Sequence, residues 1–420
     1  MPLTASPSAA ASFDAAVAGG GVAGLAAALA LAKSGLRVAL VVRGGAPAPD
    51  LRTAALFPAS VRFLEAIGAW QGCAAEAAPL RAIRILDDTS WLLKAPETVF
   101  TAAEVGEAEL ASNIANAALV RALSAALEEC PSLIKFTIAG TPHYQPASGC
   151  VVLTLPDGAA FTTKLLVAAD GRDSPAREAA GIGCKRRKLD QTALVATFAH
   201  ARPHQDVSTE LHRDAGPLTT VPLPGNRSSL VWVERPREAE RLAKLDGPGF
   251  LAELQSRLHG LLGELSMPGP RMAFPLQWLE AETFARARTA LIGEAAHVLP
   301  PIGAQGLNLG LRDAGEITRL ALAALQSGRD PGAEVVLAAY DAARRADTRS
   351  RSFTVDILNR SLESGALPLQ LARGLGLFAM NLSPAFKRAV MWHGAGGLGL
   401  PPTPGGAARL IPPPARRAAG

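Results

Sequence analysis

The 420-residue chain is poor in the residues that build metal centres and disulfide frameworks. Its four cysteines (Cys73, Cys130, Cys150 and Cys184) lie far apart and form no Cys-x-x-Cys pair. This spacing indicates neither a zinc site nor a disulfide framework, and it suits a reducing cytoplasm. His200 and His204 stand four apart, but no cysteine or carboxylate cluster accompanies them, so we expect no metal site.

Strong charge of one sign is also missing. The chain has 42 Lys+Arg against 37 Asp+Glu, a formal net charge of +5. Apart from the runs at 185–188 and 344–351, the basic residues are scattered, without the stripe and reader motif of a nucleic-acid-binding protein. We expect solvated basic faces and no nucleic-acid partner, and attraction to an anionic membrane surface is the alternative.

One long hydrophobic run, at 15–32, meets the length threshold for a membrane span. It is rich in alanine, contains Gly19-Gly20-Gly21, and follows Asp14 without the basic segment of a signal peptide. These features favour a strand, a glycine turn and a buried helix.

The expected elements alternate between strands and helices, in a chain that is 49% hydrophobic and long enough for two joined domains. A tail at 1–12 precedes a βαβ unit with a strand at 14–18, a helix at 22–34 and a strand at 37–42. Further expectations are helices at 60–67 and 117–129, a hairpin of 151–155 with 161–168, an antiparallel sheet including 194–198 and 229–234, a strand at 289–292, a helix from 307, and a helical region to about 399 before a disordered tail.

The glycine turn fits the pattern Gly-x-Gly-x-x-Gly, directly after a strand and opening a helix. Gly19 permits a tight turn, Gly21 lets the backbone approach a pyrophosphate, and Gly24 lets helix and strand pack closely. Phosphate charge would then lie at the helix N-terminus. The same pattern recurs at 394–399, but it precedes Leu-Pro-Pro, which cannot start a helix, so we expect a loop there.

The fingerprint lacks its acidic residue, which is expected at the end of the second strand to bind a ribose. Val42 occupies that place, followed by Arg43. A charge-assisted hydrogen bond contributes about 1.5–3 kcal/mol, so its absence weakens dinucleotide binding by about ten- to a hundredfold. Arg43 leaves a 2′-phosphate, and therefore NADP, as a minority alternative.

Two further strands end in polar groups, where open α/β sheets bind ligands. The strand at 165–169 leads into Asp170-Gly171, and the strand at 290–292 leads into Gly293-Glu294. The segment 300–308 then opens a helix whose first N–H groups can face developing negative charge. Asp170 as a simple turn former is the alternative to a ligand role.

These stretches resemble the DG and GD motifs of the flavin monooxygenases with the para-hydroxybenzoate hydroxylase fold. GEAAHVLPPIGAQGLNLGLRDA, RTAALFPASVRFLEAIGAW and NIANAALVRAL resemble the ubiquinone-biosynthesis hydroxylases most closely. The resemblance runs from Phe13 to about Gly399. It implies an α/β fold: a Rossmann-type FAD-binding domain, a second, antiparallel-sheet substrate domain and a helical C-terminal region.

The resemblance also implies domain boundaries and site residues. The FAD-binding domain would comprise 13–80, 101–180 and 285–345, the substrate domain 81–100 and 181–284, the helical region 346–400 and the tail 401–420. The expected FAD-binding residues are Gly19, Gly21, Ala23, Gly24, Arg52, Asn116, Asp170, Gly293, Glu294, Gly303, Gln305, Gly306, Leu307 and Asn308. Val42 replaces the acidic residue that is usual in the family, and Glu294 replaces the usual aspartate. Glu294 keeps a carboxylate acceptor, one methylene further from the backbone.

By the same resemblance, the activity is hydroxylation of a polyprenylated phenol or another aromatic small molecule in ubiquinone biosynthesis. NAD(P)H and O2 would serve as co-substrates, through a flavin C4a-hydroperoxide. We expect a cytoplasmic protein. Two further possibilities stay open: peripheral contact with the inner face of the membrane, and association with other ubiquinone-biosynthesis proteins. The alternatives are a flavin-dependent reductase or oxidase of the same fold and a non-catalytic assembly subunit.

The catalytic base is not placed by the sequence. The stretches 202–212 and 274–278 are the expected substrate-sheet segments. His297 has no carboxylate partner visible in the sequence, so we expect it to pack rather than transfer protons.

Overall fold

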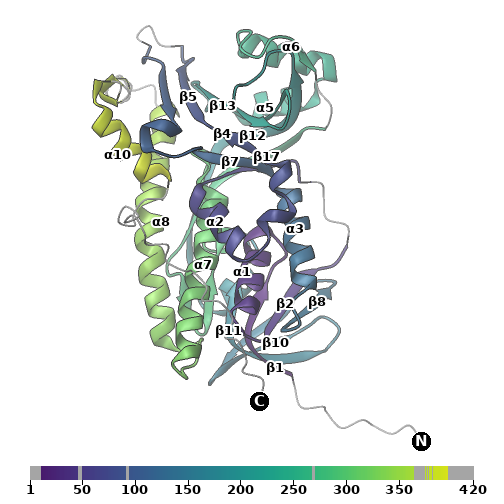
Figure 1. Ribbon diagram of the computed structural model, residues 1–420. Helices are drawn as coiled ribbons and strands as arrows, with labels where there is room; N and C mark the ends of the chain where they lie inside the picture. Colours follow the sequence, from purple (N-terminus) through teal and green to yellow (C-terminus); the bar gives the residue numbers. More distant parts are fainter. Residues whose placement is uncertain are drawn as a thin grey trace, which may run out of the picture.

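The computed structural model describes residues 11–45, 50–90, 94–266, 270–363, 374, 376, 378–380 and 382–395, without the side chains of 352–363 and 392–395. Within these residues the chain forms two large sheets, a small sheet between them, and a pair of long helices along one side (Figure 1).

The first large sheet has a parallel centre in which β1 (Ala11–Ala18) lies between β2 (Val38–Arg43) and β11 (Ala160–Ala168). Its main order is β18-β19-β11-β1-β2-β8, and β10 and β9 extend it beside β11. The other strands are β8 Leu133–Ile138, β9 His143–Ala147, β10 Cys150–Thr154, β18 Ala285–Arg286 and β19 Thr289–Leu291. Because β1 is central and parallel, its last four residues are buried, as a continuous apolar run requires.

Helix α1 (Val22–Lys33) is buried on nearly all sides, with only Ala23 and Lys33 not fully buried. It contacts β1 and β2 as well as α3 (Asn116–Glu128) and α7 (Gln305–Gln326). Small alanine side chains let all these elements approach it, which explains a helix without a polar face. The expected strand, turn and buried helix at 15–32 are therefore confirmed.

The second large sheet has the order β20-β17-β12-β15-β14-β13-β5-β6, with β16 beside β12. Its neighbours pair antiparallel except β13 and β5, which are parallel. Its strands are β5 Ala82–Asp87, β6 Thr98–Thr101, β12 Cys184–His200, β13 Val207–His212, β14 Leu218–Leu223, β15 Arg227–Glu234, β16 Leu265–Ser266, β17 Met272–Ala281 and β20 His297–Val298. Helices α5 (Pro236–Lys244) and α6 (Gly247–Arg257) bury Trp232 and Phe250 in a core of their own against it.

Short elements join the two large sheets. The small sheet has the order β3-β7-β4, and β4 and β7 contact β14 of the second large sheet. These elements are β3 Thr53–Leu56, β4 Ala78–Leu80, β7 Ala111–Ala115, α2 Pro58–Ala66, α4 Pro175–Ala179 and the 3-10 turns η1 Trp70–Gly72, η2 Ala74–Glu76, η3 Ala102–Val105 and η4 Gly293–Ala295.

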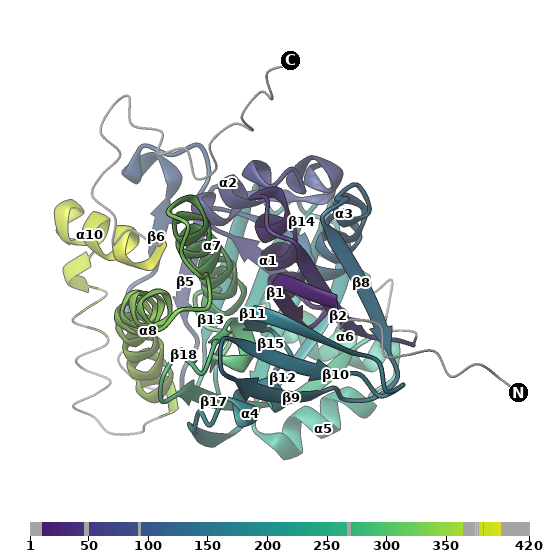
Figure 2. The same cartoon turned by 90° about the horizontal axis from the view of Figure 1, so that it is seen from below.

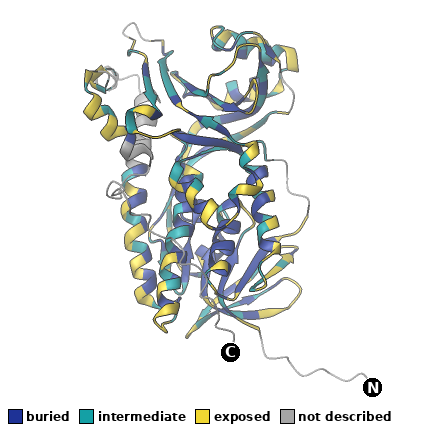
Figure 3. Cartoon of the chain, in the orientation of Figure 1, coloured by how far each residue is buried: buried dark blue, intermediate teal, exposed yellow. Residues whose placement is uncertain are grey.

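Helices α7 and α8 (Glu334–Glu363) run side by side along the molecule in Figure 1 and are seen nearly end-on beside each other in Figure 2. α10 (Pro384–Ala395) packs against η3 at the edge of the second large sheet, where Met391 joins Ala102 and Leu110. Of the α10 side chains that the structure describes, at 384–391, all but Lys387 and Met391 are exposed (Figure 3). None of the described helices has the length and apolar character needed to cross a membrane.

The fold class expected from the sequence is confirmed, and two local expectations need correction. The tail was expected to reach residue 12, but Ala11 and Ser12 extend β1 by pairing with Phe161 and Thr162. The glycine pattern at 394–399 was expected to be a loop, but Gly394 and Ala395 are the last residues of α10, and 396–399 lie outside the described residues. The domain boundaries stay a prediction, although β5 and most of β6 fall in the expected 81–100 segment.

Candidate functional site

A single cavity of about 1770 Å³ runs from the glycine turn, past the start of α7, to one face of the second large sheet. Every candidate site residue predicted from the sequence lines this cavity, except Asn308. The structure therefore brings together segments that are almost 300 residues apart in the chain, from Gly19 to Leu307.

The three glycines of the turn have different surroundings. Gly19 has φ +126°, and a Cβ there would lie 2.1 Å from the carbonyl oxygen of Ala169. A Cβ on Gly24 would lie 2.3 Å from the carbonyl oxygen of Gly19, so helix and strand pack as closely as expected. A Cβ on Gly21 would meet nothing within 4 Å, and φ is −77° there. Gly19 and Gly24 serve the fold, whereas Gly21 opens onto the cavity.

Arg52 and Asn116 converge on a third residue, Asp50. The Arg52 Nε donates to Asp50 Oδ1 at 2.8 Å, and Asn116 Nδ2 donates to Asp50 Oδ2 at 3.2 Å. Burial pushes the pKa of Asp50 up, but the Arg52 guanidinium outweighs it and lowers that pKa below its usual value. Asp50 lines the cavity and was missed in the sequence, because nothing around 50 forms a motif.

Glu294 lies between two arginines at the carboxyl end of β19. Its carboxylate is 3.5 Å from Arg52 Nη1 and 3.5 Å from Arg172 Nε, and its side chain remains 43% exposed. Arg172 comes from the segment after β11, so Glu294 joins the ends of strands from both motifs. An acceptor oriented in this way suits a sugar-like hydroxyl.

Asp170 lines the cavity and also stabilises its own turn. It accepts hydrogen bonds from Ser174 Oγ and from the backbone N–H of Ala176 at 3.0 Å, at the start of α4. Burial raises the pKa of Asp170, although these hydrogen bonds oppose the rise. The turn-forming role considered from the sequence is therefore present, together with a position on the cavity wall.

The start of α7 has an unusual backbone. Gly303 and Ala304 both have left-handed conformations, with φ +64° and +52°, and such a conformation is strained for alanine. Asn308 holds this segment: Nδ2 donates to Ala55 and Ala304 carbonyl oxygens at 2.8 and 2.7 Å, while Oδ1 accepts from Phe57 N and Ser60 Oγ at 2.9 and 2.7 Å. All the hydrogen-bonding capacity of the Asn308 amide is used within the protein. Asn308 therefore positions the cavity wall instead of lining it.

The end of β2 shows why the missing acid matters. Val42 is 9% exposed and lines the cavity, and its Cγ1 lies 3.2 Å from where a Cβ on Gly20 would stand. β2 continues through Arg43, so the two side chains leave opposite faces of the strand, although both border the cavity. Val42 thus stands beside the turn, where the resemblance places an acidic ribose acceptor.

Val42→Glu is expected to tighten FAD binding several-fold. The new carboxylate would contribute up to about 1.5–3 kcal/mol as a ribose acceptor, and its desolvation would offset part of that gain. Flavin titration of wild type, Val42→Glu, the uncharged Val42→Gln and Arg43→Ala measures the effect. If Val42→Glu binds FAD more weakly than wild type, and Arg43→Ala does so too, the ribose would instead be assigned to Arg43.

The cavity fits the FAD that the resemblance implies. Open space faces Gly21 at the N-terminus of α1. A pyrophosphate placed there would accept hydrogen bonds from the free backbone N–H groups of the helix. Asn116 Oδ1 is buried without a hydrogen-bond partner among the described residues, so it can accept from a ligand. A dinucleotide lying along this wall would extend from the turn, past Glu294, to Gly303–Leu307.

The other end of the cavity is the inner face of the second large sheet. This wall is mostly apolar, and it includes Ile83, Ile85, Phe100, Val195, Val221, Val231, Phe274 and Leu276. Among the cavity-lining residues of β5, β6 and β12 to β15, the ionisable ones are Glu210 and His212, whose Oε1 and Nε2 are 2.8 Å apart. Both belong to the stretch 202–212 that the sequence singled out for the substrate sheet, and Phe274 and Leu276 belong to 274–278.

His297 has a carboxylate partner, contrary to the expectation from the sequence. Its Nε2 lies 2.7 Å from Asp313 Oδ2, and both side chains are buried. Asp313 also accepts from the backbone N–H of Gly293 and from Arg344 Nε, at 3.0 and 2.6 Å. The partner follows 16 positions later, on another element, and for this reason it was not visible in the local pattern.

The chain resembles known proteins over most of its length. Residues 12–350 match the family model described as "FAD binding domain". Ubiquinone hydroxylase UbiL of Rhodospirillum rubrum is 35% identical, with 95% of this chain and 93% of that protein covered. The 3-demethoxyubiquinol 3-hydroxylase of Escherichia coli is 29% identical, with 91% and 98% covered.

Solved structures show the same fold. PqsL of Pseudomonas aeruginosa, a probable FAD-dependent monooxygenase, superimposes with a TM-score of 0.73 at 22% identity, covering 88% of this chain and all of that one. The p-nitrophenol 4-monooxygenase PnpA of Pseudomonas putida gives 0.74 at 17% identity, covering 93% of this chain and all of that one. With the glycine turn, the two strand-end motifs and the cavity that joins them, the chain belongs to the FAD binding domain family, among the FAD-dependent aromatic monooxygenases.

Proposed function

We propose that the chain hydroxylates the aromatic ring of a polyprenylated phenol in ubiquinone biosynthesis, with NAD(P)H as reductant and O2 as oxygen source. The observation that carries the proposal is one cavity with two chemically different ends. The end at Gly21 and Glu294 has the polar groups for a dinucleotide, and the end at the second large sheet is apolar. The names of the relatives point to ubiquinone precursors as the substrate class.

When bound, FAD supplies the redox and oxygen chemistry, and the chain's own residues have to bind, orient and exclude water. The first residues of α7, Gln305–Leu307, line the cavity, and the free N–H groups of a helix start favour negative charge nearby. Apolar side chains of β5, β6 and β15 form the opposite wall and exclude water from that end of the cavity. The Glu210–His212 pair offers the substrate's hydroxyl a polar contact on that wall.

The decisive experiment supplies labelled O2 and either NADH or NADPH to the purified, flavin-loaded protein with a prenylated phenol. We expect the label in the new ring hydroxyl and a preference for one nicotinamide donor. Product without label would indicate a reductase or oxidase of the same fold. A purified protein without flavin absorption would indicate the non-catalytic alternative.

We also propose peripheral contact with the membrane through the segment that includes α10. Phe378, Leu382, Phe386 and Val390 follow one another at intervals of four and are 52%, 68%, 48% and 38% exposed. Arg388 adds an exposed basic side chain on the same segment. Met380, Val390 and Met391 line the cavity, so this surface borders a path between a lipid phase and the substrate end.

Sedimentation with anionic phospholipid vesicles tests the membrane contact. We expect wild type to sediment with the vesicles and the double variant Leu382→Ser/Phe386→Ser to remain largely in the supernatant. Val335→Ser removes a 60% exposed apolar side chain from α8 and serves as the matched control. Wild type that stays in the supernatant would contradict the contact. Association with other ubiquinone-biosynthesis proteins stays a prediction, which co-purification tests.

A further inference from the structure

One carboxylate stands in the wall at the apolar end of the cavity. Residues that pair directly across neighbouring strands have their side chains on the same face of a sheet. In the second large sheet, one such row crosses five strands and lines the cavity, and it consists of Ile85, Glu210, Thr219, Val231 and Val195. The opposite face of this sheet packs into the core formed with α5 and α6. Glu210 is therefore the one charged residue of a row that faces the substrate end.

His212 orients the Glu210 carboxylate. It follows two residues later on β13, on the same face, and its Nε2 lies 2.8 Å from Glu210 Oε1. Because an ionised carboxylate only accepts hydrogen bonds, Nε2 is the donor. The His212 Nδ1 is buried and has no hydrogen-bond partner among the described residues, so a proton there would be a buried donor without an acceptor. The imidazole proton therefore belongs on Nε2, where it holds the carboxylate in place.

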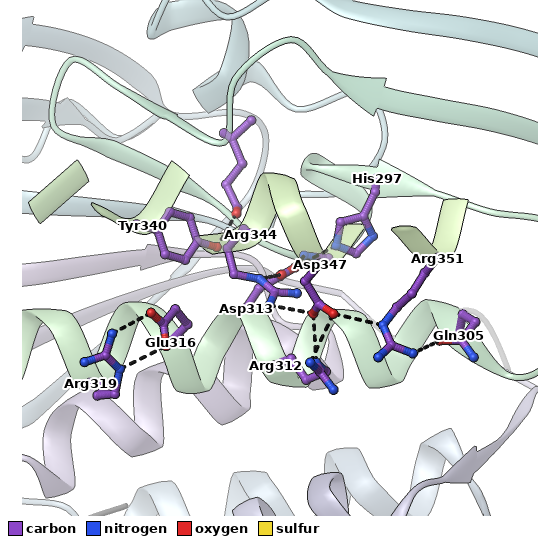
Figure 4. A network of polar contacts seen from close by, with 12 residues as sticks. His297, Gln305, Arg312, Asp313, Glu316, Arg319, Tyr340, Arg344, Asp347 and Arg351 are labelled. Atoms are coloured by element: carbon purple, nitrogen blue, oxygen red, sulfur yellow. Dashed lines mark hydrogen bonds and ion pairs between the residues drawn. The ribbon is translucent and has the colours of Figure 1, made fainter. Parts of the chain in front are cut away.

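A second histidine–carboxylate pair beside the cavity provides a comparison (Figure 4). In the pair His297–Asp313 both carboxylate oxygens are used: Oδ2 accepts from His297 and from the backbone N–H of Gly293, and Oδ1 accepts from Arg344. The Oε2 of Glu210 accepts no hydrogen bond from the part of the chain that the structure describes, and this side chain is 14% exposed. Glu210 therefore has an oxygen available to a ligand, whereas Asp313 has none.

We propose that Glu210 is the base that accepts the hydroxyl proton of the phenolic substrate, and that His212 is its positioning residue. The inference rests on the proposed function and assigns roles within the same site. A prenylated phenol in the apolar end of the cavity donates its hydroxyl hydrogen bond to Glu210 Oε2.

The proton moves as the ring is attacked. When the new oxygen bonds to a ring carbon, the ring loses electron density, the substrate O–H bond breaks and its electron pair forms a C=O bond, while the proton passes to Glu210 Oε2. The attacked carbon then releases its own hydrogen to water as a proton, and Glu210 returns its proton to the oxygen. The ring is aromatic again, and Glu210 is unchanged over a turnover.

Ligand binding to the oxidised, flavin-loaded protein, without reductant, tests the contact. The probes are a prenylated phenol and its methyl ether, which differ in the hydroxyl proton that Glu210 accepts. We expect wild type to bind the phenol about tenfold or more tightly than the ether, because hydrogen bonds to charged groups are among the stronger ones. Glu210→Leu is expected to remove this preference and His212→Leu to reduce it. His212→Gln keeps an N–H donor and is expected to restore most of it.

Steady-state kinetics separates proton transfer from binding. Glu210→Gln keeps a hydrogen-bond acceptor but takes no proton, so we expect kcat for ring hydroxylation to fall about a hundredfold or more, with little change in KM. Glu240→Gln replaces a 65% exposed glutamate of α5 and is the matched control, which should leave kcat and the preference for the phenol unchanged.

Equal weakening of phenol and ether in Glu210→Leu, or an unchanged kcat in Glu210→Gln, overturns the proposal, because a structural role predicts no discrimination between the two ligands. If Glu210→Leu does not fold, the nearly isosteric Glu210→Gln and the two His212 variants provide the test. Wild type that hydroxylates no phenol would instead contradict the proposed function, so the two failures are distinguishable.

Discussion

Gly21→Val is expected to abolish retention of FAD while leaving a folded protein. The ordinary φ of −77° and the open space around Gly21 let the chain itself accept a side chain. That open space is where the pyrophosphate would approach the N-terminus of α1, so two extra methyl groups and a Cβ would exclude it. Flavin absorption after purification measures the retention of FAD, and circular dichroism measures whether the protein is folded.

Gly24→Val is the informative comparison. Its Cβ would collide with the carbonyl oxygen of Gly19 at 2.3 Å, so that variant is expected to lose folded structure as well as flavin. Normal flavin content in folded Gly21→Val would remove the assignment of this turn to the pyrophosphate. Unfolding of both variants alike would show that Gly21 serves the fold.

Asp313→Ala is expected to destabilise the protein by about 3–5 kcal/mol, because it leaves the Arg344 guanidinium buried without this partner. Asp313 is fully buried and is bonded to His297, Arg344 and the N–H of Gly293. The free energy of unfolding, from denaturant titration, measures the loss. Glu316→Ala breaks an exposed ion pair one turn further along α7 and should cost less than about 1 kcal/mol.

The same carboxylate predicts a dependence of stability on pH. Burial raises the pKa of Asp313, but the charges of Arg344 and His297 and the hydrogen bonds outweigh it and lower that pKa to about 2. A folded-state pKa below the unfolded one contributes stability above about pH 4, and this contribution is lost as the pH falls toward about 2. Acid titrations of wild type and Asp313→Ala should therefore converge over this interval. Parallel curves would contradict the prediction.

The sequence predicts the parts of this protein that depend on local periodicity and on turn chemistry. Apolar runs bounded by glycine and polar turns predict a helix at 22–34 and strands at 37–42 and 161–168, and each observed element ends within one residue of these bounds. Gly19 and Gly24 follow from a turn in which any larger side chain collides with the backbone. The family resemblance adds the cofactor, because three motifs in one order are far more specific than each alone.

The sequence was least informative where a residue depends on a distant partner. Asp50 belongs to no motif, yet it binds both Arg52 and Asn116. Asn308 lies inside a motif, yet its amide is used up by Ala55, Ala304, Phe57 and Ser60.

The amino-acid sequence by itself determined the α/β class, the glycine turn and the strand ends that make up the cofactor side, since these depend on neighbours in the chain. Only the tertiary structure decided which charges meet. Asp313, Asp347 and Arg351 form one buried cluster because α7 and α8 pack side by side, and nothing in their spacing fixes that contact. The physical reason is that a buried charge is stabilised only by the partner that packing places within hydrogen-bonding distance, and packing is a property of the whole fold.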